Sequence, residues 1–205
     1  MLTTLTARAY AARLAAGEPT PGGGSAAALV GALGVALGEM AANFTRGKDT
    51  WEHIEAPLAR LEQHRQALLD LTDADAEAYA PVGAAYAMPR ATDEEKAARR
   101  EAIQAALKQA AQVPLQAVER IAAAIAELPT LAEHANKNLL RDVGVAAAFT
   151  LAALKTAWLN VEINLAGIKD EDYVQDIRCG WQGRLAEAEK TAAAVWEQVS
   201  ESICG

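Results

Sequence analysis

The stretch Pro21-Gly22-Gly23-Gly24-Ser25 opens directly into an apolar run from Ala26 to Phe44, and this junction decides the fold. The run is mostly alanine, leucine and glycine, and the first two are strong helix formers, which predicts one long helix from about Ser25 to Arg46. Because serine is a preferred N-cap residue, we expect Ser25 to cap this helix. Three consecutive glycines allow backbone torsions, and a close approach of a ligand, that side chains would prevent.

The glycine segment has two interpretations. The first turn of a helix carries free N–H groups and a partial positive charge, which suit a phosphate or a carboxylate. Gly22, Gly23, Gly24 and Ser25 are therefore candidate binding residues. A flexible linker that leads into a capped core helix explains the same residues equally well.

Composition points to one helical domain spanning residues 1–205. Hydrophobic residues make up 52% of the chain and aromatic residues only 5%, and alternating runs of Val, Ile and Thr are missing. We expect an all-α bundle of about six or seven helices with long central helices. Several of these are apolar on most sides, which predicts a homodimer that shares the middle helices.

The net charge and the cysteines indicate which partners and which cellular compartment to expect. The net charge is −8 and no cluster of Lys or Arg is present, which argues against a nucleic-acid partner. Cys179 and Cys204 form no disulfide or metal motif, as is typical of free thiols in the cytoplasm. The first residues show no signal-peptide pattern. The Ala26–Met40 run reads as a buried helix because it is short and rich in Ala and Gly, so no membrane partner is expected.

The three histidines show no metal-ligand spacing, and no metal is expected. Proline, glycine and capping signals divide the rest of the chain. Pro81 should kink or end a helix, a capping box at Thr92 and Glu95 should begin another, and Pro114 should bend it. The expected helices are Thr6–Ala16, Ser25–Arg46, Trp51–Tyr86, Thr92–Leu128, Leu139–Ile168 and Asp170–Ile203, with a connector or short helix over 129–137.

Two aspartates interrupt an otherwise apolar helical segment. Asp73 and Asp75 are two positions apart and point to nearly opposite faces, whereas Asp75 and Tyr79 share a face. A carboxylate against an apolar wall has a raised pKa and can transfer protons near neutral pH. Solvated surface charges are the alternative, and periodicity does not decide which aspartate faces inward.

Other polar residues recur at helical spacing. Asn160 and Asn164 lie one turn apart on an apolar helix, where they make either a helix–helix polar contact or a ligand contact. Asp142 lies at the start of the same helix, where it either favours the helix dipole or contacts a ligand. Lys48 follows the glycine-loop helix, where a cation can hold a carboxylate or simply complement the helix C-terminus.

Together these segments resemble the formiminotransferase-cyclodeaminase C-terminal domain and its stand-alone relatives, which include methenyltetrahydrofolate cyclohydrolases. The matching motifs run in the family's order and cover nearly the whole chain. They are Pro21-Gly22-Gly23-Gly24-Ser25, Gly47-Lys48, Asp73-Ala74-Asp75-Ala76 with Tyr79 and Pro89, Val113-Pro114-Leu115, Asp142, and Asn160-Val161-Glu162-Ile163-Asn164-Leu165.

The resemblance implies a dimeric helical enzyme that acts on the N5/N10 bridge of tetrahydrofolate, as a cyclodeaminase or a cyclohydrolase. The folate is then the substrate, and no separate cofactor is implied. The family's catalytic aspartate matches Asp75, a general acid and base. Gly22 to Ser25, Lys48, Tyr79, Asp142, Asn160 and Asn164 are the expected substrate contacts. No formiminotransferase sequence accompanies these motifs, which favours the cyclohydrolase reaction.

Two residues depart from the family pattern. Arg90 stands where a lysine is usual after the proline, and Arg141 stands where a serine usually precedes the aspartate. A bulky cation at Arg141 leaves open a non-catalytic folate-binding relative. A helical oligomerisation module without a ligand is the third interpretation.

Overall fold

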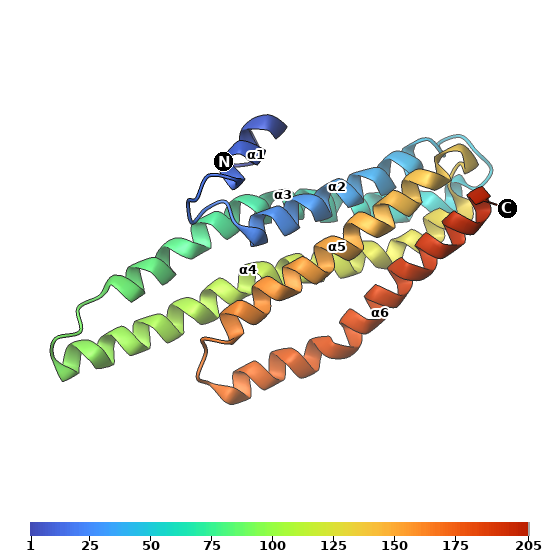
Figure 1. The fold of residues 1–205 in the computed structure, drawn as a ribbon. Helices are drawn as coiled ribbons and strands as arrows, with labels where there is room; N and C mark the ends of the chain where they lie inside the picture. The colour runs from blue at the N-terminus through green and yellow to red at the C-terminus, as the bar shows by residue number, and fades with distance from the viewer. Residues whose placement is uncertain (205) are drawn as a thin grey trace.

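The computed structural model describes residues 1–204, except for the side chain of Cys204, and the described chain is helical without strands. The helices are α1 (Ala7–Leu14), α2 (Gly23–Asn43), α3 (Trp51–Ala87), α4 (Asp93–His134), the 3-10 turn η1 (Lys137–Leu139), α5 (Leu140–Leu165) and α6 (Glu171–Cys204). The expected all-α bundle is confirmed. Figure 1 shows an elongated bundle of α2 to α6, with the short α1 set outside it.

The core lies between α2, α3, α4 and α5, and small residues bring their backbones close together. A methyl group on Gly31 would lie 3.0 Å from Ile121 of α4, and one on Gly34 would lie 2.9 Å from Thr150 of α5. Glycine at these two positions of α2 therefore allows tight helix packing. Leucine and isoleucine side chains fill the remaining space, among them Leu68 of α3 and Leu154 of α5, which are fully buried.

One predicted helix end is wrong: α4 continues past Pro129 to His134, so residues 129–134 belong to α4 rather than to a connector or a separate short helix. Helix α3 continues through Pro81 to Ala87, one residue beyond its expected end at Tyr86. An interior proline removes one backbone hydrogen bond. Packing of the long helices against one another outweighs that loss, since the residues around Pro129, Leu128 and Leu131, are fully buried.

The start of α2 also differs from the prediction. The N-cap is Gly22, whose conformation is extended, and Ser25 lies inside the first turn. The capping box at the start of α4 is confirmed, because the Thr92 side chain accepts from the Glu95 N–H and the Glu95 side chain accepts from the Thr92 N–H.

Helices α2 and α5 leave large apolar side chains on the surface. Leu33 of α2 and Phe149, Leu159 and Ile163 of α5 are exposed by 50%, 40%, 66% and 71%. The segments Gly23–Asn43 and Lys137–Leu165 are also long and apolar enough to cross a membrane, a test that core helices of soluble proteins pass as well. The central helices are apolar, as expected, and these large apolar side chains lack cover within one protomer.

Candidate active site

The Asp75 carboxylate lies against the N-terminus of α2. Its Oδ2 accepts hydrogen bonds from the Ser25 backbone N–H at 2.8 Å and from the Ser25 hydroxyl at 3.2 Å. The anion expected at this helix N-terminus is therefore a side chain of the protein itself. Of the two aspartates that periodicity could not separate, Asp75 is the one that faces the glycine segment.

Gly24 is required by this arrangement. A methyl group at Gly24 would overlap the Asp75 carboxyl, with its carbon only 2.6 Å from Cγ. Glycine is therefore needed at residue 24 for close approach, and the carboxylate is what approaches.

Burial controls the protonation of Asp75. Desolvation raises the pKa of this carboxyl, and the two hydrogen bonds from Ser25 only partly offset the effect. A carboxyl group with a raised pKa both accepts and returns a proton more readily near neutral pH. The Asp75 environment therefore suits a general acid and base.

Asp75 borders a hollow of about 350 Å³ between α2, α3, α4 and α5. Three kinds of residue line it: the backbone of the glycine segment, apolar side chains and a few polar groups. They are Pro19, Thr20, Gly22, Gly23, Gly24, Asp75, Ala78, Tyr79, Val82, Leu107, Ala110, Asn160, Ile163 and Asn164. No Lys or Arg is in this lining, so Asp75 dominates the charge of the hollow as the structure describes it.

Most of the residues predicted for the site meet here. Tyr79, Asn160 and Asn164 all border the hollow with Asp75 and the glycines. Each asparagine donates one amide hydrogen to the carbonyl four residues earlier, at 2.8 Å, which fixes its orientation on α5. Ser25 contributes through Asp75 rather than through the lining.

Asp73 has a separate structural role. It accepts hydrogen bonds from the Leu2 and Thr3 backbone N–H groups and, at 2.6 Å, from the Thr3 hydroxyl. Burial tends to raise the pKa of Asp73, but these hydrogen bonds outweigh it and lower the pKa. Asp73 thus anchors the start of the chain and stays ionised.

Lys48 and Asp142 do not reach the hollow within one protomer. Lys48 follows the far end of α2, and Asp142 lies in the first turn of α5, which adjoins that end. Hydrogen bonds from Asn136 to the Phe44 carbonyl and the Thr45 hydroxyl tie these segments together. Asp142 Oδ2 is buried without a hydrogen bond in the described residues, and Arg141, 3.6 Å away, is largely exposed.

Sequence reasoning missed the apolar wall opposite Asp75. Val82 of α3 and Leu107 and Ala110 of α4 form it, and nothing in their spacing separates them from ordinary core residues.

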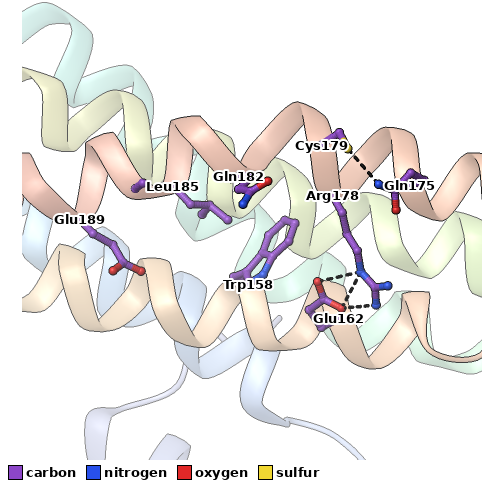
Figure 2. Close-up of a pocket in the computed structure, with 9 residues that line it drawn as sticks. Trp158, Glu162, Gln175, Arg178, Cys179, Gln182, Leu185 and Glu189 are labelled. Carbon is purple, nitrogen blue, oxygen red and sulfur yellow. Dashed lines mark hydrogen bonds and ion pairs between the residues drawn. The ribbon is translucent and has the colours of Figure 1, made fainter.

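A second groove lies between α5 and α6, away from Asp75. It measures about 500 Å³, and Figure 2 shows Trp158 in its centre with Arg178 turned onto Glu162. The Arg178 guanidinium donates to both Glu162 carboxylate oxygens, at 2.6 to 3.2 Å. Glu162 already balances the charge of Arg178, so the residues that line this groove include no counterpart of the partly buried Asp75 carboxyl.

Comparison with known proteins identifies the family to which this chain belongs. The model of the family described as "Formiminotransferase-cyclodeaminase" matches residues 6–182, which include the glycine segment, Asp75 and both asparagines. The chain belongs to the formiminotransferase-cyclodeaminase family. The resemblance carried by the sequence motifs is thereby confirmed.

The relatives of this formiminotransferase-cyclodeaminase family member are named for two different reactions. It is 40% identical to a methenyltetrahydrofolate cyclohydrolase of Methylorubrum extorquens, over 93% of each chain. It is 36% identical to the formimidoyltransferase-cyclodeaminase of Rattus norvegicus, of whose length it covers 36%. A crystal structure of formiminotetrahydrofolate cyclodeaminase from Thermotoga maritima matches with a TM-score of 0.79 and 33% identity, over 98% of this chain and 96% of that one.

Proposed function

We propose that this family member is a methenyltetrahydrofolate cyclohydrolase that uses Asp75 as its general acid and base. The observation that carries the proposal is the Asp75 carboxyl, whose pKa burial raises, at the edge of a hollow between the glycine segment and an apolar wall. The similarity to the M. extorquens cyclohydrolase over nearly the whole of both chains supports the choice of reaction. A cytoplasmic location and a reaction without a separate cofactor are part of the proposal.

The proposed reaction begins with water beside the cationic methenyl bridge of the substrate. Ionised Asp75 removes a proton as the water oxygen bonds to the bridge carbon. Asp75 then returns a proton to N5 as the bond between N5 and this carbon breaks, which gives 10-formyltetrahydrofolate. The second proton of the water leaves to solvent, so one water is consumed and one proton is released.

The hollow offers complementary surfaces for this substrate. Val82, Leu107 and Ile163 provide apolar contact for a ring system, and Asn160 and Asn164 provide amide groups for its polar edge. Tyr79, half exposed at the rim, closes one side. The negative charge of Asp75 favours a cationic bridge, and this attraction strengthens as water leaves the site.

The cyclodeaminase reaction is the second candidate, because the matching T. maritima structure carries that name and is covered almost completely. In that reaction N10 attacks the formimino carbon of 5-formiminotetrahydrofolate. Asp75 would take the N10 proton and deliver it to the departing amine, which leaves as ammonia. The same carboxyl position serves both reactions.

One assay separates these alternatives: the purified protein is given each folate, and methenyltetrahydrofolate absorbance is followed. Loss of absorbance faster than the uncatalysed rate supports the cyclohydrolase, and its appearance from 5-formiminotetrahydrofolate supports the cyclodeaminase. Saturable folate binding without turnover would instead indicate a non-catalytic relative. Absence of both would leave the oligomerisation module.

We further propose that the protein is a homodimer whose contact is the exposed apolar face of α2 and α5. Leu33 is the midpoint of the 21-residue helix α2 and is half exposed, and Phe149 lies beside its neighbour Gly34. An antiparallel pairing of two α2 helices about Leu33 would bring the C-terminal end of one helix beside Gly23 of the other. The partner's Lys48 would then approach the hollow that contains Asp75.

We expect Leu33→Glu to convert the dimer to a monomer, because a charge in the centre of an apolar interface is costly to desolvate. Sedimentation velocity measures the change. Leu14→Glu is the matched control, since Leu14 is exposed by 40% but lies on α1. A wild-type monomer, or dissociation by both variants alike, contradicts the proposed interface.

Mixed dimers test whether Lys48 acts across the interface. Lys48→Ala and Asp75→Asn subunits, each of low activity alone, should recover about a quarter of wild-type activity when mixed in equal amounts. About half of the dimers then contain one subunit of each kind, and one of the two sites in each such dimer has both residues intact. Turnover after subunit exchange is the measurement. If Lys48 acts within its own chain, or has no role, no recovery of this kind occurs.

A further inference from the structure

One side of α2 carries an apolar stripe that the bundle leaves partly uncovered. Its members recur at alternating spacings of four and three residues, whereas most of the residues between them are buried in the core. Leu33 in the stripe and Phe44 at its end are exposed by 50% and 59%. Apolar residues at this heptad spacing form the contact between two helices in a coiled coil. This stripe, the α2 seam, comprises Ala26, Val30, Leu33, Leu37, Met40 and Phe44.

An apolar pocket of about 390 Å³ lies at the other end of the α2 seam, between α2 and α5. Small residues form most of its lining, among them Ala26 and Ala152, and none of the lining residues is charged. A cavity of about 150 Å³ is enough for a benzene molecule, so this pocket can take an aromatic ring.

The apolar pocket shares a wall with the hollow that contains Asp75. Gly23 and Asn160 border both cavities. A methyl group on Gly23 would lie 3.5 Å from the Asn160 amide, so the two residues lie side by side. A side chain that fills the apolar pocket therefore packs against the far side of this wall.

Two-fold symmetry relates the two ends of the α2 seam. When two copies of α2 run antiparallel and cross at Leu33, each residue faces the one equally far on the other side of Leu33 in its partner. Phe44 lies eleven residues after Leu33, and Gly22 lies eleven residues before it. Heptad spacing gives a crossing angle of only about 20°, which keeps the helix ends close together. The ring of the partner's Phe44 therefore reaches the opening of the apolar pocket.

We propose that Phe44 of each subunit fills the apolar pocket of the other and supports the wall of its catalytic hollow from outside. The inference rests on the proposed homodimer and adds the residue through which one subunit acts on the other's site. A phenyl ring matches the uncharged lining of the pocket. Asn160, held on α5 by its bond to the Thr156 carbonyl at 2.8 Å, is then also packed on the side away from the hollow.

Phe44→Ala tests the contact by removing the ring. We expect the dissociation constant of the dimer to rise about 10- to 100-fold, because an aromatic anchor is lost from the interface. Sedimentation equilibrium over a dilution series measures the constant. Trp196→Ala is the matched control, since Trp196 is exposed by 49% but lies on α6, and it should leave the constant unchanged.

An exchange of ring and pocket gives a second test. Ala26→Phe fills the pocket from its own chain, so it should exclude the partner's Phe44 and weaken the dimer. Addition of Phe44→Ala to Ala26→Phe should restore the dissociation constant to within about threefold of wild type, because each pocket again holds one ring. The two residues are about 27 Å apart along α2, so this rescue arises between subunits rather than within one.

Fluorine NMR observes the ring without a change of shape. Labelling with 4-fluorophenylalanine marks Phe44 and Phe149, the two phenylalanines of the chain, and Phe44→Leu identifies the signal of residue 44. In the dimer this signal should lose its shift between water and heavy water, because the ring is shielded from solvent. The monomerising variant Leu33→Glu should restore the shift.

The shared wall also predicts an effect on the site. At concentrations that keep it dimeric, Phe44→Ala should bind 5-formyltetrahydrofolate, a stable folate, about three- to tenfold more weakly, because Asn160 is less well ordered before binding. Calorimetry measures the affinity, and Trp196→Ala should bind as the wild type does. Unchanged affinity in Phe44→Ala would overturn the link between Phe44 and the site.

The outcomes separate this inference from the proposals on which it rests. A dimer that Phe44→Ala leaves intact, with a fluorine signal equally exposed before and after Leu33→Glu, overturns the role of Phe44 and leaves the pocket to another occupant. A wild-type monomer overturns the homodimer as well. The dimer and fluorine measurements use no folate, so the proposed cyclohydrolase reaction is decided by the turnover assay alone.

Discussion

Asp75→Asn should reduce turnover of methenyltetrahydrofolate by about 10²- to 10⁴-fold, the usual contribution of a general acid or base. Asparagine has nearly the same shape, and its side-chain oxygen can still accept from the Ser25 N–H, which lies 2.8 Å from the carboxylate in the wild type. The geometry is therefore preserved while the ionisable proton site is lost. Initial rates at saturating folate, with circular dichroism to confirm folding, measure the effect.

The matched control for this variant is Asp70→Asn on the same helix. Asp70 is exposed and accepts only from Gln66 in the described chain, so its turnover should equal that of the wild type. The pH profile adds a second check. Activity should fall as the pH drops through the raised pKa of Asp75, since the protonated carboxyl cannot accept the proton of water. Turnover by Asp75→Asn at the wild-type rate would remove the basis of the mechanism.

Gly24→Ala should impair both stability and turnover, because its methyl group would overlap the Asp75 carboxyl. Either Asp75 turns away and loses its hydrogen bonds from Ser25, or α2 moves away from α3. Overpacking of this kind costs about 1–3 kcal/mol of unfolding free energy. We expect that loss in denaturant titrations, together with a decrease in kcat similar to that of Asp75→Asn.

Gly180→Ala separates this clash from the general effect of adding a methyl group. A methyl group at Gly180 meets nothing within 4 Å among the described atoms, and the residue lies inside helix α6. Alanine is the better helix former by about 1 kcal/mol, so Gly180→Ala should be slightly stabilising and fully active. If Gly24→Ala behaves in the same way, the carboxylate does not need the space that glycine leaves.

The helix content follows from local sequence patterns. Alanine-rich composition and the box at Thr92 and Glu95 are local signals, and both were correct. The helix end before Pro129 was wrong because the penalty of an interior proline is local, whereas the packing that offsets it is tertiary.

Within the site, the sequence alone could not determine which aspartate faces inward. Asp73 and Asp75 have similar neighbours along the chain, and their different surroundings arise from segments about 50 to 70 residues away, Ser25 for one and Leu2 and Thr3 for the other. The family resemblance selected Asp75, and in the structure this aspartate is the one that lies beside Ser25 and borders the hollow. Lys48 and Asp142 remain predictions, because one chain does not bring them to the hollow.

The burial of the Asp75 carboxyl, which the hydrogen bonds from Ser25 offset only in part, has a thermodynamic consequence. The pKa of Asp75 is raised by folding, so its charge opposes the native state, and the protein should gain stability as the pH falls from neutral through that pKa. Neutralising this one group should make the protein more resistant to denaturation at neutral pH. A carboxylate at residue 75 lowers the stability of the folded state, whereas an amide would serve the architecture equally well. The presence of the carboxylate indicates selection for chemistry rather than for stability.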